Sequence, residues 1–78
     1  MREDKLRTNL TNGKFNYTLR LFIYGGAFRV QYTKTTCDIG LSRLVAHEDG
    51  CYETQGMAIQ HYFRIFNYMV AQYKIECD

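Results

Sequence analysis

The chain has 78 residues and a formal net charge of +2, from ten Lys and Arg against eight Asp and Glu. This length predicts one small domain over 1–78, and so weak a charge excludes any argument for nucleic-acid binding from charge alone. Residues 1–14 hold no apolar stretch of the kind that a signal peptide needs, and Arg64, Asn67 and Gln72 interrupt the one candidate membrane span. We therefore expect a cytoplasmic domain that does not bind membranes.

The first segment, 1–12, is polar and charged, with Leu6 and Leu10 four residues apart. That spacing predicts either a short N-terminal helical turn or a mobile arm. Thr11-Asn12-Gly13 is a turn signal that leads into the next segment.

Two runs on either side of Gly25-Gly26 become matched partners when the chain folds back at that dipeptide. One face of the ribbon is almost wholly apolar and the other is mostly polar, as in a sheet that covers a core on one side. The apolar face pairs Ile23 with Phe28, Leu21 with Val30, Leu19 with Tyr32 and Tyr17 with Lys34. The polar face pairs Phe22 with Arg29, Arg20 with Gln31, Thr18 with Thr33 and Asn16 with Thr35. Because adjacent glycines supply the positive φ of a two-residue turn, the sequence predicts an antiparallel β-hairpin over 14–36.

The segment 37–50 supports two interpretations. Alternation of Cys37, Ile39 and Leu41 favours a short third strand or an extended link, whereas 42–47 fits a short helix capped by Ser42. The strand is favoured because an isolated hairpin is marginally stable. A turn is expected at 48–50, where Glu-Asp-Gly ends the segment.

The C-terminal segment predicts a long amphipathic helix with Thr54 as its N-cap. One apolar stripe at helical spacing consists of Ile59, Tyr62, Phe63, Phe66, Met69, Val70 and Tyr73. A second apolar flank holds Met57, Ile65, Tyr68 and Ile75. Since a small sheet covers one stripe, the second flank is expected to be covered by the rest of the chain or by a partner, including a second copy in a homodimer.

The expected fold class is α+β, with an antiparallel β-hairpin or three-stranded sheet packed on the C-terminal α-helix and a short N-terminal helix as an optional extra. The expected core joins two sets of apolar residues. The sheet gives Leu19, Leu21, Ile23, Phe28, Val30 and Tyr32, and the helix gives Ile59, Phe63, Phe66 and Val70.

Side chains able to bind zinc are present but poorly spaced. They are Cys37, His47, Cys51, His61 and Cys77. Only His47 and Cys51 lie close in the sequence, whereas zinc ligands usually come in close pairs. We therefore predict neither metal nor cofactor, and metal binding by Cys37, His47 and Cys51 stays open.

Motifs for catalysis are equally weak, so the protein is not expected to be an enzyme. Ser42 lacks the glycines of a nucleophile elbow. Cys51 beside His47 or His61 lacks an orienting third group. The acids around 48–53 fit a solvated loop better than a catalytic pair.

Two groups of residues are predicted to bind a partner. Arg20, Phe22, Tyr24 and Arg29 share the outer hairpin face, where rings are mixed with cations, and Ile65 and Tyr68 lie on the second helix flank. Such side chains are suitable anchors for a protein surface or, as the alternative, for RNA or DNA bases.

The preferred function is a small non-enzymatic protein-binding domain. Many chains of this size without catalytic motifs are phage or mobile-element proteins that inhibit a host protein or nucleoprotein machine, such as anti-CRISPR proteins, and we expect this function here. The alternatives are an RNA- or DNA-binding module and a self-associating structural subunit. The order of elements resembles a double-stranded-RNA-binding domain in outline, but residues 53–58 lack the lysines that contact phosphates there.

Overall fold

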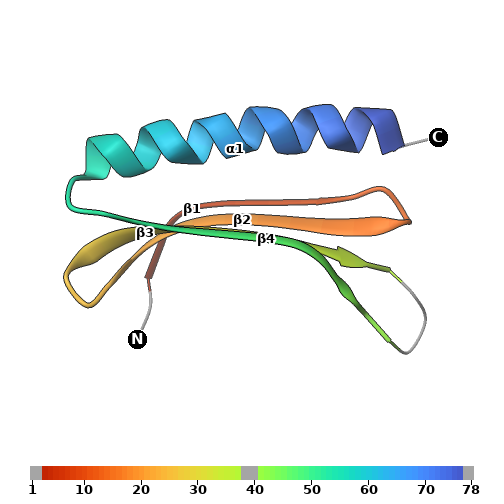
Figure 1. Cartoon of the computed structure of the whole chain (residues 1–78), viewed down its shortest axis with the longest axis horizontal. Coiled ribbons are helices and arrows are strands. Elements are labelled where there is room, and N and C mark those ends of the chain that lie inside the picture. Colours follow the sequence, from red (N-terminus) through yellow and green to blue (C-terminus); the bar gives the residue numbers. More distant parts are fainter. Residues whose placement is uncertain (1–2, 38–40, 77–78) are drawn as a thin grey trace.

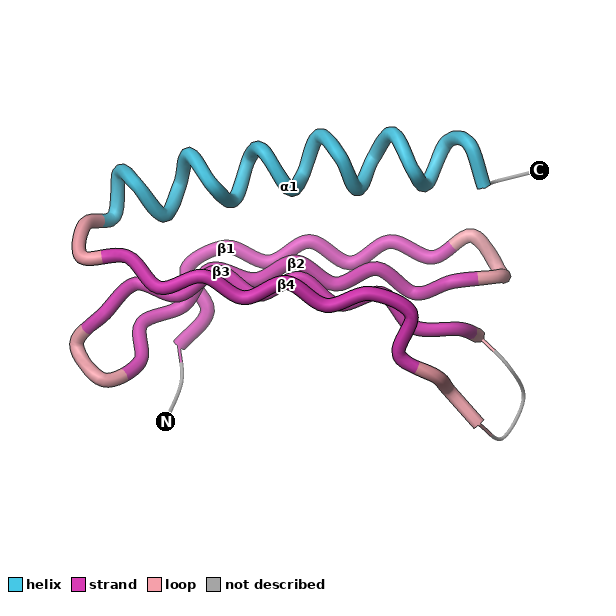
Figure 2. The backbone as a smooth tube through the Cα atoms, viewed as in Figure 1, coloured by secondary structure: helices cyan, strands magenta, loops and turns pink. Residues whose placement is uncertain are grey.

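A computed structural model describes residues 3–37 and 41–76. Within these residues, four antiparallel strands form one sheet in chain order, and a single helix lies across one of its faces (Figure 1, Figure 2). The elements are β1 (Glu3–Thr11), β2 (Phe15–Tyr24), β3 (Ala27–Thr36), β4 (Leu44–Tyr52) and α1 (Gln55–Glu76). The α+β prediction is confirmed, with more strands than expected. Within the described part of the chain, no helix is long and apolar enough to cross a membrane.

β1 occupies the place of the expected N-terminal helical turn or mobile arm. Leu6 lies opposite Leu21 and Leu10 lies opposite Tyr17 in the neighbouring strand. A spacing of four places two leucines on one face of a helix, but it also places them on one face of a strand. The helix prediction is therefore wrong because the edge of β2 offers backbone hydrogen bonds that an isolated helical turn lacks.

The central hairpin has the predicted register at every pair, from Phe15 opposite Thr36 to Tyr24 opposite Ala27. Gly25 and Gly26 make the turn with φ values of 63° and 78°. The preceding turn signal is also confirmed, because the Asn12 side-chain oxygen accepts the backbone N–H groups of Lys14 and Phe15, each at 3.0 Å.

The segment after β3 returns as β4, but this strand begins at Leu44, beyond the alternation of Cys37, Ile39 and Leu41 that predicted it. Cys37 and Leu41 lie outside the strands, so the additional strand lies later in the chain than expected. Residues 44–47 are strand, so a helix capped by Ser42 is wrong, and 48–50 continue β4 instead of turning. Ile39 lies outside the described residues. Pairing with β3 satisfies the backbone groups of β4 that face this strand, and this outweighs the local turn preference of Glu-Asp-Gly.

The face of α1 that meets the sheet lies between the two predicted apolar stripes. The buried side chains are Ala58, Tyr62, Ile65 and Met69. They pack against Tyr17, Leu19, Leu21, Val30 and Tyr32 of the sheet. A helix with a wide apolar arc buries most area when the middle of that arc faces the central strands. Both flanks of the arc then lie above the edge strands and stay partly exposed.

Two expected core residues are consequently exposed. Phe63 lies on one flank of α1 and is 49% exposed, whereas Phe66, one turn further along the helix, is half-buried. Ile23 is 38% exposed because the sheet near the β2–β3 turn bends away from α1 (Figure 1). The other expected core positions are buried or half-buried.

A charged cluster fastens the last turn of α1 to the sheet. Lys34 Nζ donates to both carboxylate oxygens of Glu76, at 2.8 and 2.9 Å, and the Tyr17 hydroxyl donates to the same carboxylate at 3.1 Å. The ammonium group also lies 4.2 Å from the centroid of the Phe15 ring. Hydrogen bonding from Lys34 and Tyr17 lowers the pKa of Glu76. Lys34, the charged residue on the apolar hairpin face, is thus paired with Glu76.

Candidate binding surfaces

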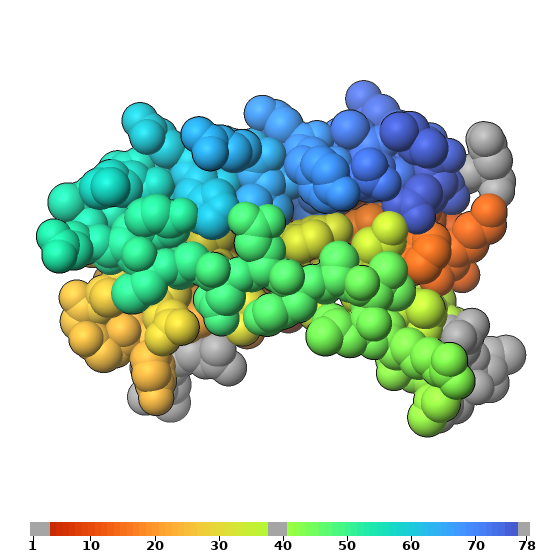
Figure 3. All heavy atoms as spheres, viewed as in Figure 1, coloured from red at the N-terminus to blue at the C-terminus, as the bar shows by residue number. Residues whose placement is uncertain are grey.

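The face of the sheet opposite α1, here called the outer face, is concave. The β2–β3 turn and the start of β4 both bend away from α1, so the sheet arches between them (Figure 1, Figure 3). A hollow of about 380 Å³ lies on this face. It is lined by Phe22, Tyr24, Arg29, Gln31 and Asp49. Among the described elements, none covers the outer face.

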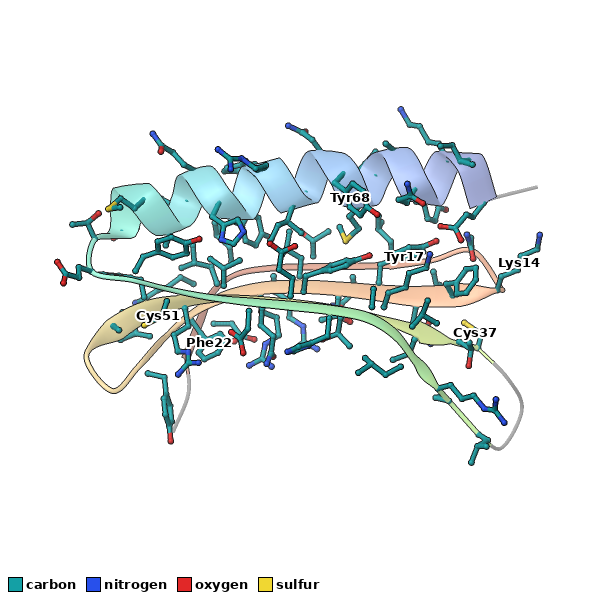
Figure 4. All side chains as sticks on the ribbon, viewed as in Figure 1. Lys14, Tyr17, Phe22, Cys37, Cys51 and Tyr68 are labelled. Carbon is teal, nitrogen blue, oxygen red and sulfur yellow. The ribbon has the colours of Figure 1, made fainter. Side chains whose placement is uncertain are left out.

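Three of the four outer residues predicted to bind a partner line this hollow, namely Phe22, Tyr24 and Arg29, and Arg20 lies beside Phe22. Arg20 and Phe22 alternate along β2 opposite Gln31 and Arg29 of β3, and the Arg20 guanidinium carbon lies 4.9 Å from the centroid of the Phe22 ring. Phe22 points away from α1 but is only 3% exposed (Figure 4). It forms the floor of the hollow, so its expected role as an exposed anchor is corrected. Tyr24 is 60% exposed.

The arginines of the outer face are engaged with carboxylates. Arg20 Nη2 and Nε donate to Asp4 Oδ1 at 3.1 and 3.3 Å, and Arg7 Nη1 donates to Asp4 Oδ2 at 3.3 Å. Arg29 Nη2 lies 3.9 Å from Asp49 Oδ2. The hydrogen bond from Arg20, with the charges of Arg20 and Arg7, lowers the pKa of Asp4 against the effect of burial. On the outer face these arginines are therefore paired with carboxylates and do not form a uniform cationic patch.

Ile65 and Tyr68, the helical residues of the prediction, lie on the other layer of the molecule. Tyr68 is 59% exposed, whereas Ile65 is 4% exposed and belongs to the core. The expectation that Ile65 lies at the surface is wrong, because the helix turns the middle of its apolar arc toward the sheet. The six residues thus fall on two separate surfaces and in the core.

A second hollow, here called the β4–α1 groove, follows the seam between β4 and α1, onto which Figure 3 looks. Its volume is about 370 Å³. The lining residues are Tyr32, Ala46, His47, Glu48, His61, Arg64, Ile65 and Tyr68. The lining of the groove therefore combines apolar side chains with hydrogen-bonding groups.

One end of the groove is held by a chain of three polar side chains. His61 Nε2 lies 3.1 Å from Glu48 Oε1, and His61 Nδ1 is hydrogen-bonded to the Tyr52 hydroxyl. Because an ionised carboxylate only accepts, Nε2 carries the proton that it donates to Glu48, and in the neutral imidazole Nδ1 accepts from the Tyr52 hydroxyl. Gly50 makes room for this arrangement, since a Cβ there would lie 2.9 Å from both His61 Nδ1 and the Tyr52 ring.

Tyr32 of β3 also lines the groove. The residue is 3% exposed, and its hydroxyl oxygen is buried without a hydrogen-bond partner among the described residues. Burial, followed by the nearby Tyr68, Glu76 and Glu48, raises the pKa of this phenol. The hydroxyl is therefore a protonated donor at neutral pH.

The groove was not predicted from the sequence, in which Glu48 and Gly50 indicated a turn and Tyr32 indicated ordinary core. A glycine inside a strand often marks a close approach of other groups, and Gly50 was the one available signal.

The candidate zinc ligands and acids are dispersed. Cys51 points to the outer face, opposite Arg29, and Cys37 lies past the end of β3, near Thr11 (Figure 4). Cys77 lies outside the described residues. No group of three His, Cys, Asp or Glu side chains within 3–37 and 41–76 is arranged to hold a metal ion. Glu48 and Asp49 are neighbours on β4 and face opposite sides of the sheet.

Comparison of the chain with protein-family models, with curated proteins and with solved structures finds no match.

Proposed function

We propose that this protein is a non-enzymatic protein-binding domain that engages its partner through the outer face. The observation that supports this most directly is the uneven cover of the sheet. α1 packs on one face only, and the other is hollowed, with an aromatic floor at Phe22 and an exposed Tyr24 beside it. Concave surfaces with a buried aromatic and an exposed tyrosine are suited to anchoring a protein partner.

The chemistry of the hollow favours a partner with an acidic or carbonyl group. Arg29 Nε is buried and has no hydrogen-bond partner in the part of the chain that the structure describes. Its guanidinium is only loosely paired, at 3.9 Å from Asp49. The Arg29 side chain as a whole is 35% exposed, so a carboxylate or backbone carbonyl from a partner would form a charge-assisted hydrogen bond with the accessible part of the guanidinium.

A protein fits this face better than a nucleic acid does. Binding along a phosphate backbone draws most of its free energy from cations that replace condensed counterions. Here Arg7 and Arg20 already bind Asp4, and a phosphate would have to displace that carboxylate or lie beside it. We therefore rank the nucleic-acid module second.

In its finer form the proposal is an inhibitor of a host protein or nucleoprotein machine, encoded by a phage or mobile element and similar in kind to anti-CRISPR proteins. It rests on the small size of the chain and on the weakness of every catalytic motif in its sequence. Such an inhibitor works by occupying a surface, which needs no turnover.

The test compares two tyrosines of equal exposure on opposite layers. Tagged wild-type protein and the Tyr24→Ala and Tyr68→Ala variants are used in parallel to capture proteins from nuclease-treated host extract. Partners are identified by mass spectrometry and rebound with purified components. Tyr24 is 60% exposed and Tyr68 is 59% exposed, so both substitutions remove similar accessible rings.

We expect a stoichiometric protein partner that Tyr24→Ala weakens at least tenfold and that Tyr68→Ala leaves unchanged, as for loss of an anchoring aromatic side chain. A partner lost only with Tyr68→Ala would place the interface on the other layer. Recovery of nucleic acid alone, with affinity that falls steeply as salt rises, would replace the proposal by the second candidate.

A further inference from the structure

We infer that the protein forms a homodimer in which the free edge of β1 pairs antiparallel with β1 of a second copy. The two sheets then join into one sheet, with both helices on the same face. The contact lies at the edge of the sheet, so it leaves the outer face accessible and does not depend on the protein-binding proposal. Three features support it: the open edge of β1, the self-complementary order of its side chains and the uncovered flank of α1.

The edge of β1 is open to another strand. Among the described strands, β1 pairs with β2 only, so the backbone groups on its other side have no strand to pair with. Its register with β2 shifts between Asp4 and Leu6 and is regular from Leu6 to Thr11. A regular, unpaired edge is a template for pairing with another chain.

The order of side chains along β1 fits an antiparallel copy of itself centred on Thr8. In that register, Leu6 lies opposite Leu10 of the second copy on the inner face, and Thr8 lies opposite Thr8. On the outer face Arg7 lies opposite Asn9 of the second copy, so no like charges are opposed. Cross-strand pairs of apolar residues and of threonines stabilise antiparallel sheets, whereas opposed like charges destabilise them. A register centred one residue earlier would place Arg7 opposite its own copy.

The other edge of the sheet, β4, does not match a copy of itself. A register centred on Glu48 or on Asp49 places two carboxylates opposite one another. A register centred on His47 places the apolar Ala46 opposite Glu48. Charged side chains at an edge commonly protect it against pairing with other chains. β1 is therefore the edge that suits a second copy.

The flank of α1 on the β1 side adds an apolar surface above this edge. α1 lies mainly over β2, β3 and β4, and the two leucines of β1 are only half-buried. Tyr62 marks the flank that faces β1, because its hydroxyl lies 2.6 Å from Thr8 Oγ1. Next to it Phe63 is 49% exposed, with its ring centroid 6.1 Å from that of Phe66. In the dimer these flanks face one another across the axis, above the leucines of both strands, which removes apolar surface from water.

The test measures the mass of the full-length protein by sedimentation equilibrium over a range of concentrations. The paired stretch is short, and interfaces below about 1,200 Å² of total buried area are weak. We therefore expect a monomer–dimer equilibrium with a Kd of about 10–100 µM. A protein that stays monomeric up to about 1 mM would overturn the inference.

Asn9→Arg tests the register. Asn9 is exposed and lies opposite Arg7 of the second copy, so the substitution opposes cations on both sides of the axis and should weaken the dimer at least about threefold. His47→Arg is the control, because it places the same cation at an exposed position of β4, and we expect no change in Kd. Arg7→Glu combined with Asn9→Arg makes each opposed pair one of opposite charge and should restore the wild-type Kd. Asp4, which loses Arg7 in this double variant, keeps its hydrogen bonds from Arg20.

The results separate β1 from other contacts. A dimer weakened by His47→Arg and not by Asn9→Arg would place the contact at β4 and overturn the inference. A double variant that dimerises no better than Asn9→Arg alone would overturn the register centred on Thr8. Far-UV circular dichroism of each variant shows that the fold is intact.

A second measurement needs no substitution. Protein labelled with ¹³C is mixed with unlabelled protein well above the Kd, and isotope-filtered NMR detects contacts between copies only. Leu6 and Leu10 lie about 13 Å apart along one strand, so contacts between their methyl groups are expected only across the dimer axis. Absence of these contacts in a sample that sediments as a dimer would overturn the inference.

Discussion

The Glu76→Gln substitution tests the attachment of the helix to the sheet. It keeps the shape of the side chain and removes the charge that pairs with Lys34 Nζ at 2.8 Å. The lysine side chain is 11% exposed and the glutamate side chain 21%, so the ion pair lies between the buried and the surface cases. Breaking a buried pair costs about 3–5 kcal/mol and a surface pair about 0–1 kcal/mol, and we expect about 2 kcal/mol here.

A loss of that size is large for so small a domain. A domain of this length has a free energy of unfolding of about 4–12 kcal/mol. The expected fall in Tm is about 8–16 °C. The assay is urea and thermal unfolding followed by far-UV circular dichroism. Glu53→Gln is the control, because it removes one carboxylate at an exposed position and is expected to change the free energy of unfolding by less than about 0.5 kcal/mol.

A double mutant separates loss of the ion pair from loss of packing. Lys34→Met together with Glu76→Gln leaves an apolar side chain beside Phe15 and Tyr17 and no buried charge. We expect the double variant to be more stable than Glu76→Gln alone. The reasoning is refuted if Glu76→Gln unfolds like the wild type, or if the two substitutions destabilise additively.

Acid should remove the same contribution. Lys34 and Tyr17 hold the pKa of Glu76 below its usual value of 4.5, so the pair adds stability above that pH. This stability is lost as the pH falls through the lower pKa of the folded state. The difference in free energy of unfolding between wild type and Glu76→Gln should therefore shrink below that range. A difference that stayed constant with pH would contradict the assignment.

Three further comparisons examine the packing. Gly50→Ala places a Cβ 2.9 Å from facing side chains and should lower the free energy of unfolding in urea by about 1–3 kcal/mol. Gly56→Ala, in the first turn of α1, meets no atom within 4 Å and should raise this free energy by about 0.5–1 kcal/mol. Equal effects of the two changes would refute the tight fit at Gly50. Ile65→Ala should lower the free energy of unfolding by about 2–4 kcal/mol and Phe63→Ala by distinctly less, because Ile65 is 4% exposed and Phe63 is 49% exposed. The reverse order would mean that α1 presents a different face to the sheet. Burial and the hydrogen bond to Glu76 raise the pKa of Tyr17 to about 12. The stability that depends on the protonated phenol is therefore full below about pH 10 and should fall as the pH rises toward 12. Tyr17→Phe should lack this alkaline transition in unfolding experiments.

The central hairpin is the part of this fold that the sequence determined by itself. Its register depends on contacts between residues close along the chain, on the period of two in the side chains and on two glycines that permit one turn. The start of α1 at Thr54 is equally local, since the Thr54 hydroxyl oxygen accepts the Met57 backbone N–H at 3.3 Å.

Tertiary structure decided the rest, because the local signals there fit more than one answer. The spacing of Leu6 and Leu10 suits a helix or a strand, and only the free edge of β2 selects the strand. The helix has apolar residues on both flanks, and the width of the sheet determines that Ile65 is buried and Phe63 exposed. The β4–α1 groove joins Tyr32, Glu48 and His61 from three elements, so along the chain only the isolated glycine at Gly50 indicated it.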